Sequence, residues 1–143
     1  KLGESHDPES HLIPNIMKAV LEDREFTLFG DDYNTPDGTC VRDYIHVLDL
    51  ASAHILALEA LEKGHKTGVY NAGTGKGYSN KEIIAMIEKV SGRQVKVKVS
   101  PRRLGDADIL VADSSKLQKE INWKPQYSDL ETIIETAWQW HNK

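Results

Sequence analysis

Residues 79–99, SNKEIIAMIEKVSGRQVKVKV, decide the fold class because they change from helical to strand periodicity within one short stretch. Ser79 and Glu82 have the spacing of a helix capping box. Isoleucines then recur at the intervals of one helix face until Gly92, a typical helix-ending residue. The alternating valines of residues 95–99 predict a half-exposed strand. A helix and a strand joined this closely indicate a mixed α/β fold.

Apolar spacing predicts further helices, about five in all. The first carries Leu12 to Leu21, and the last runs from Leu130 towards His141. The remaining two lie near residues 49–63 and 114–122. We expect Asp49 and Ser114 to be helix N-caps, Asn122 to take a left-handed helix-ending conformation, and Ser128 with Glu131 to form a second capping box. On the helix after Asp49, the side chains expected to be buried are Leu50, Ile55, Leu58 and Leu61.

Short strands are expected at residues 26–29 and 69–72, in addition to 95–99. These strands are too few and too short for a complete doubly wound sheet. The predicted fold class is therefore α/β, in the form of a small α+β domain.

Composition restricts the classes of partner. The 143 residues suffice for one compact domain, and a net charge of -4 argues against nucleic acid or an anionic membrane. No apolar run approaches the roughly 18 residues of a membrane span. Cys40 is the only cysteine, so no internal disulfide can form, which fits a reducing cytoplasm. The chain starts at Lys1 without a methionine, and we expect it to be a piece of a longer protein.

Two segments combine arginine, carboxylate and a turn-forming glycine: DGTCVRDYIHV at residues 37–47 and PRRLGD at residues 101–106. A guanidinium can bind a phosphate through two parallel N–H bonds, so Arg42 and Arg103 together would suit a pyrophosphate. Asp106 would then be free to accept hydroxyl protons from a sugar. The alternative is that these arginines form surface ion pairs of little energetic value.

Two other motifs are weaker. The loop GTGKG at residues 73–77 is either a flexible turn or a loop lying against a nucleotide, and it matches neither common phosphate-binding pattern. His6, Asp7, Glu9 and His11 lie close together in sequence. Their spacing fits no fixed ligand geometry, so we expect no metal site there.

The order of the motifs resembles the C-terminal part of the UDP-glucose 4-epimerase family, within the extended short-chain dehydrogenases/reductases. The most specific matching run is residues 37–47, and the resemblance also covers HLIP at 11–14, FGDDY at 29–33, YNAG at 70–73, PRRLGD at 101–106 and WKP at 123–125. It therefore extends over nearly the whole chain.

The resemblance implies an isomerase that interconverts UDP-glucose and UDP-galactose in galactose metabolism, through a 4-keto intermediate and with NAD. The N-terminal Rossmann half of such an enzyme, which holds NAD and the catalytic residues, is missing. We accordingly expect no catalytic residue and no bound cofactor in this chain. The helix near 49–63 and the strand near 68–72 would pack on the missing half. The parent enzyme would be a homodimer, and the isolated fragment would self-associate through the uncovered surface.

The resemblance also assigns substrate contacts. Arg42 and Arg103 would bind the pyrophosphate, Asp106 a ribose hydroxyl, and Tyr44 the phosphate–sugar side. Around the nucleoside it places His11, Leu12, Thr27, Leu28, Phe29 and Asn80. His11 stands where many relatives have asparagine. Leu110 occupies the position that controls room for a 2-N-acetyl group.

Three interpretations remain open. The first is the substrate-binding part of a UDP-hexose 4-epimerase. The second is the same region of a UDP-N-acetylglucosamine 4-epimerase, or of another sugar-nucleotide epimerase or dehydratase. The third is a non-catalytic nucleotide-sugar-binding module.

Overall fold

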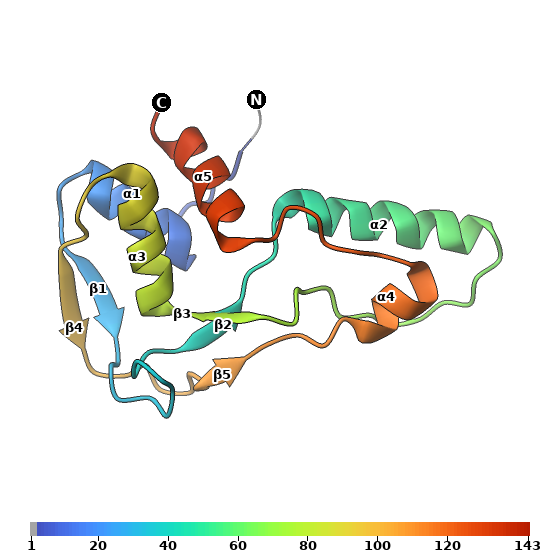
Figure 1. Ribbon diagram of the computed structural model, residues 1–143, viewed down its shortest axis with the longest axis horizontal. Helices are drawn as coiled ribbons and strands as arrows, with labels where there is room; N and C mark the ends of the chain where they lie inside the picture. The colour runs from blue at the N-terminus through green and yellow to red at the C-terminus, as the bar shows by residue number, and fades with distance from the viewer. Residues whose placement is uncertain (1–2) are drawn as a thin grey trace.

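The computed structural model describes residues 3–143, and its elements divide between two regions (Figure 1). Three helices and a pair of strands form one end of the molecule, and a long helix extends away from them toward a short one. A small second sheet lies between the two ends. The predicted fold class, a small α/β domain with few strands, is confirmed.

The main core lies where three helices pack against the parallel strand pair. The helices are α1 (Leu12–Leu21), α3 (Asn80–Ser91) and α5 (Leu130–His141), and the strands are β1 (Phe26–Phe29) and β4 (Val97–Ser100). Ile16, Ile83, Ile87 and Ile134 are fully buried at the centre of this core. Burying such side chains contributes about 1.5–3 kcal/mol each, which makes this region the main source of the fold's stability.

The second sheet has three short strands in the order β3-β2-β5. β2 (Val41–Asp43) pairs antiparallel with β3 (Gly77–Ser79) and parallel with β5 (Ile109–Leu110). A Cβ at Gly77 would collide with the side chain of Val41, so this position requires glycine. The sequence did not predict these strands, because two or three residues are too few to show a periodicity.

The long helix α2 (Val47–Glu62) packs on the short helix α4 (Ser115–Ile121) through a second, smaller core. Trp123 is fully buried there, and its Nε1 donates to the backbone oxygen of Asp49 and to Ser52 Oγ, both at 3.0 Å. The Asp49 side chain accepts hydrogen bonds from Gln126 N, Tyr127 N and Ser128 Oγ at 2.8, 2.9 and 2.5 Å. Asp49 therefore joins α2 to the segment that leads into α5.

Two predicted caps are wrong for the same reason. His46, not Asp49, caps α2, through Nδ1, which accepts from Leu48 N at 3.1 Å. Asp129, not Ser128, caps α5 and accepts from Thr132 N at 2.9 Å. Asp49 and Ser128 instead bind each other, an interaction between distant residues that local spacing does not reveal.

Three other predictions need correction. Residues 69–72 form no strand, and Val69 is 85% exposed. The apolar residues expected to be buried on α2 are exposed in this chain: Leu50, Ile55, Leu58 and Leu61. Strand β4 begins at Val97, two residues later than expected.

The residues predicted to begin α3 and to end α3 and α4 are confirmed. Ser79 and Glu82 form the predicted capping box of α3, and Gly92 ends that helix with φ +67°. Asn122 ends α4 in the left-handed conformation with φ +59°. Across the described part of the chain, none of the helices is both long enough and apolar enough to cross a membrane.

Candidate functional site

An open groove of about 370 Å³ runs along β1, between the start of α1, the start of α3 and the loop that follows β4. It brings together residues from segments far apart in the sequence. Most of the predicted substrate contacts line it, namely Leu12, Thr27, Leu28, Phe29, Asn80, Arg103 and Asp106. Ser10, Asn15, Arg24, Glu25 and Phe26 complete the lining.

The strand pair explains how these residues meet. Because β1 and β4 are parallel, both end at the same edge of the pair, with Phe29 opposite Ser100. Gly30 N donates to Ser100 O at 2.8 Å, and this bond keeps the C-terminal ends of the two strands together. The loop after β4 therefore carries Arg103 and Asp106 to the end of the groove formed by Phe29.

Of the two predicted arginines, Arg103 lies against Phe29 and Arg42 lies near Asp106. The guanidinium carbon of Arg103 is 4.0 Å from the centre of the Phe29 ring. Arg42 Nη2 lies 3.8 Å from Asp106 Oδ1, and Arg42 Nη1 donates to Val41 O and Ala107 O at 2.8 Å each. Arg103 and Asp106 line this end of the groove, and Arg42 lies beside Asp106 but outside the lining. Two guanidinium groups and one carboxylate suit a phosphate beside a hydroxyl-bearing sugar.

Tyr44 and Leu110 lie near this end but do not line the groove. Tyr44 is half-buried against the main core, and this burial raises the pKa of its hydroxyl to about 12, so it stays protonated at neutral pH. Leu110 pairs with Arg42 across β5 and β2, and it is 56% exposed.

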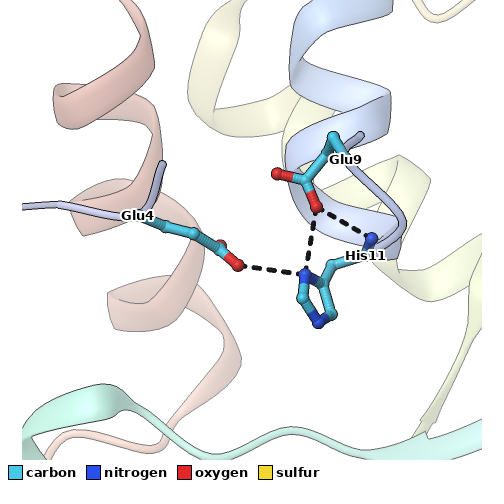
Figure 2. Close-up of side chains that lie close together, drawn as sticks. All are labelled: Glu4, Glu9 and His11. Carbon is cyan, nitrogen blue, oxygen red and sulfur yellow. Dashed lines mark hydrogen bonds and ion pairs between the residues drawn. The ribbon is translucent and has the colours of Figure 1, made fainter. Parts of the chain in front are cut away.

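His11 lies outside the groove lining, in a cluster with two carboxylates. Figure 2 shows Glu4 and Glu9 converging on one ring nitrogen, with each Oε1 at 3.0 Å from His11 Nδ1. Burial alone would raise the pKa of Glu9, but hydrogen bonds from His11 and Ser10 hold it below its ordinary value. These three side chains have ligand atoms within 4.8 Å of one another, which is the spacing of a group that could hold a cation. The grouping differs from the sequence cluster, because Glu4 joins it.

The glycine-rich loop at residues 73–77 does not offer its amides to a ligand. Thr74 N and Gly75 N each donate to the Asp43 carboxylate at 3.0 Å, and Thr74 Oγ1 donates to the same group at 2.6 Å. A dinucleotide loop needs such N–H groups free to face the pyrophosphate. The geometry therefore favours the structural turn over a dinucleotide-binding loop at residues 73–77.

Sequence reasoning missed the residues that hold the ends of the groove. Asn15 Nδ2 donates to the backbone oxygens of Glu9 and His11, at 3.2 and 2.9 Å, and so fixes the turn before α1. Arg102 binds Asp32 on the opposite loop. The one available signal was its position next to Arg103.

Residues 2–73, about half of the chain, match the NAD dependent epimerase/dehydratase family. The chain belongs to this family. Among its relatives, the UDP-glucose 4-epimerase of Halalkalibacterium halodurans is 49% identical over 144 residues, which cover 100% of this chain and 43% of that protein.

Two solved epimerase structures support the same assignment. The UDP-glucose 4-epimerase from Brucella ovis, in complex with NAD, has a TM-score of 0.94 and 47% identity over 99% of this chain and 44% of its own. The enzyme from Bifidobacterium longum, in complex with NAD+ and UDP, has a TM-score of 0.84 and 40% identity over 92% of this chain and 39% of its own. This NAD dependent epimerase/dehydratase family member spans less than half the length of the relatives it matches. The resemblance inferred from the motifs is confirmed.

Proposed function

We propose that this chain is the UDP-hexose-binding part of a UDP-glucose 4-epimerase, an isomerase that interconverts UDP-glucose and UDP-galactose. The observation that carries the proposal is the groove along β1, which joins an apolar wall to a cationic end. The family and the UDP bound in the Bifidobacterium longum structure support the choice of ligand.

Each part of the groove suits one part of the ligand. Leu12, Leu28 and Phe29 offer apolar surface to a planar base. Arg103 and Arg42 supply N–H donors for the pyrophosphate, and Asp106 accepts from a ribose hydroxyl. We assign Asn80, which lines the groove, and Tyr44, two residues after Arg42, to the edges of the nucleotide.

NAD, which accompanies the related crystal structures, would be held by the rest of the enzyme, where it would accept and return a hydride. This chain's own residues would bind and orient the UDP-sugar. In keeping with the sequence resemblance, we expect the full enzyme to be a cytoplasmic homodimer.

The arginines provide the test. In the full-length enzyme, Arg103→Ala and Arg42→Ala should each weaken UDP binding by about 1.5–3 kcal/mol, the range for charge-assisted hydrogen bonds. Lysine at either position should restore the affinity only in part, because an ammonium cannot form two parallel N–H bonds. Calorimetry with UDP measures both effects.

Arg93→Ala is the matched control. Arg93 is also exposed, lies 5.9 Å from the Trp138 ring and does not line the groove. It should leave UDP affinity unchanged. Unchanged affinity in both Arg42→Ala and Arg103→Ala would show that these arginines form surface ion pairs and would refute the proposal.

A further inference from the structure

The cationic end of the groove is carried by residues 101–108, which form neither helix nor strand. Leu104 is fully exposed, Gly105 has φ +87°, and the hydrogen bond from Asp106 N to Arg103 O is long at 3.4 Å. Backbone hydrogen bonds hold the segment at its two ends. Ser100 O, just before the segment, accepts from Gly30 N at 2.8 Å, and Asp108 O accepts from Val41 N at 2.9 Å. The middle of the segment, which bears Arg103 and Asp106, depends on side chains for its position.

Arg102 supplies such an anchor. Its Nε donates to Asp32 Oδ1 at 2.6 Å, and its Nη2 donates to the backbone oxygen of the same residue. Its Nη1 lies 3.9 Å from Asp108 Oδ1, which ties the start of the segment to its end. The hydrogen bond from Arg102 lowers the pKa of Asp32 below its ordinary value, so the pair stays ionised at neutral pH.

The opposite loop is shaped to receive this side chain. The guanidinium carbon of Arg102 lies 4.2 Å from the centre of the Tyr33 ring, and Tyr33 is only 4% exposed, so the ring is a fixed platform. A Cβ at Gly30, which has φ +81°, would collide with Tyr33 and would lie 2.8 Å from Arg102 Cγ. Asn34 N adds a hydrogen bond of 3.2 Å to Asp108 Oδ2.

The two consecutive arginines thus stack on two aromatic rings that belong to the same short segment, residues 29–33. Arg102 lies on Tyr33, and Arg103 lies on Phe29, four residues earlier, at the end of β1. Holding Arg102 therefore fixes the point from which Arg103 reaches the groove. Arg102 itself does not line the groove.

We infer that Arg102, held by Asp32 and Tyr33, is a positioning residue that sets Arg103 in place for the nucleotide diphosphate. This rests on the proposed function, because it assumes that Arg103 binds the UDP part of the substrate. Arg102 acts through its neighbour and makes no contact with the ligand.

The test uses the full-length enzyme and UDP. Arg102→Gln keeps most of the side-chain length but removes the charge and the forked donors, and it should weaken UDP binding about tenfold. KM for UDP-galactose should rise by a similar factor with kcat nearly unchanged, because binding rather than chemistry is affected. Asp32→Asn should have the same effect, and the double variant should be no weaker than either single variant. Arg102→Lys should fall between Arg102→Gln and the wild type.

A double-mutant cycle shows whether the effect passes through Arg103. In the Arg103→Ala background, Arg102→Gln should change UDP affinity by less than about twofold. Hydrogen exchange should accelerate at residues 101–108 and stay unchanged over α3. Arg93→Gln is the control, since it removes the same charge from an arginine near a ring elsewhere in the fold.

Two results would overturn the inference. One is a tenfold loss that persists in the Arg103→Ala background. The other is unchanged affinity in Arg102→Gln and Asp32→Asn while Arg103→Ala still weakens binding, which leaves the proposed function intact. If Arg103→Ala itself leaves UDP affinity unchanged, the proposed function fails and Arg102 has nothing to position.

Discussion

Asp49 is a single residue that holds two distant segments together. It is 1% exposed, and its carboxylate accepts from two backbone amides and one hydroxyl of residues 126–128. Ser128 Oγ also accepts from His46 N at 2.9 Å, so the start of α2 and the approach to α5 share one hydrogen-bond network. A buried network of this kind is stabilising only while every member has its partner.

Replacing this carboxylate should destabilise the chain. Asp49→Asn turns one acceptor oxygen into a donor that faces other donors, and it should lower the free energy of unfolding by about 1.5–3 kcal/mol at pH 7. Urea unfolding measures the difference. Asp113→Asn is the matched control, because exposed Asp113 accepts a similar bond from Ser115 N at 2.9 Å. The control should change stability by less than about 1 kcal/mol.

The same variant predicts a pH dependence. Burial raises the pKa of Asp49, but hydrogen bonds from Ser128, Gln126 and Tyr127 outweigh it and hold the pKa below the ordinary 3.8. A depressed folded pKa means that the carboxylate contributes stability above pH 3.8 and loses it as the pH falls through the folded value. The stability gap between wild type and Asp49→Asn should therefore shrink as the pH falls below about 3.8. A gap that stays constant down to acid unfolding would contradict this.

The position of Leu110 leads to a prediction about which UDP-hexoses the full enzyme accepts. It lies on β5 beside Arg42 and is exposed, so it is free to face a sugar attached to a diphosphate bound at Arg42. We expect the full enzyme to prefer UDP-glucose and UDP-galactose and to act slowly on the N-acetylated pair. Leu110→Gly should raise relative kcat/KM for the N-acetylated pair and Leu110→Tyr should remove that activity, with changes of about 1–3 kcal/mol. A flat ratio across the three proteins would show that this residue does not face the sugar.

Among the described elements, α2 carries the most exposed large apolar side chains. Val47, Ile55, Leu58 and Leu61 are 50–70% exposed along this helix. Such a surface favours association because it removes apolar area from water. The isolated chain should therefore self-associate at high concentration, and sedimentation should show an average mass that rises with concentration.

Substitutions on α2 give the test of that association. Ile55→Lys with Leu58→Lys should shift the isolated chain toward the monomer. His54→Lys is the control, because it adds a lysine to the exposed side of the same helix without removing an apolar residue. A chain that stays monomeric at every concentration, or a control that is as effective as the double variant, would contradict the prediction.

Elements with local signals could be predicted from the sequence, and elements that depend on neighbours could not. The capping box of α3 and the endings at Gly92 and Asn122 involve residues within a few positions of one another. The expected strand at 69–72 has alternating apolar residues but no partner strand in the described chain. A strand forms only where another strand accepts its hydrogen bonds, so periodicity alone was insufficient.

At the scale of the whole molecule, the chain should not act as an enzyme by itself. It should fail to interconvert UDP-glucose and UDP-galactose even with added NAD, because binding a UDP-sugar supplies no path for hydride transfer and the amides of its glycine-rich loop are occupied by Asp43. A coupled assay on the purified chain measures this, with the full-length enzyme as the positive control. Turnover above the buffer rate, with contaminating epimerase excluded, would refute it.

The candidate site was partly predictable at this scale. The motifs identified Arg103, Asp106 and the strand at 26–29, and the structure gathers these into one groove. The sequence could not reveal how His11 is engaged by Glu4 and Glu9, or that Arg102 grips Asp32. Those contacts depend on loop paths, which side-chain periodicity does not encode.

The network around Asp49 also has a consequence for synthesis on the ribosome. The donor at Gln126 lies 77 residues after Asp49, so the helix that begins near Asp49 emerges long before the residues that satisfy its carboxylate. During that interval the helix can form locally, but its anchoring to the last helix must wait until the chain is almost complete. Contacts of such long range slow folding. This end of the molecule should be the last to become resistant to proteases in a nascent chain, and a stall before Gln126 should leave it open.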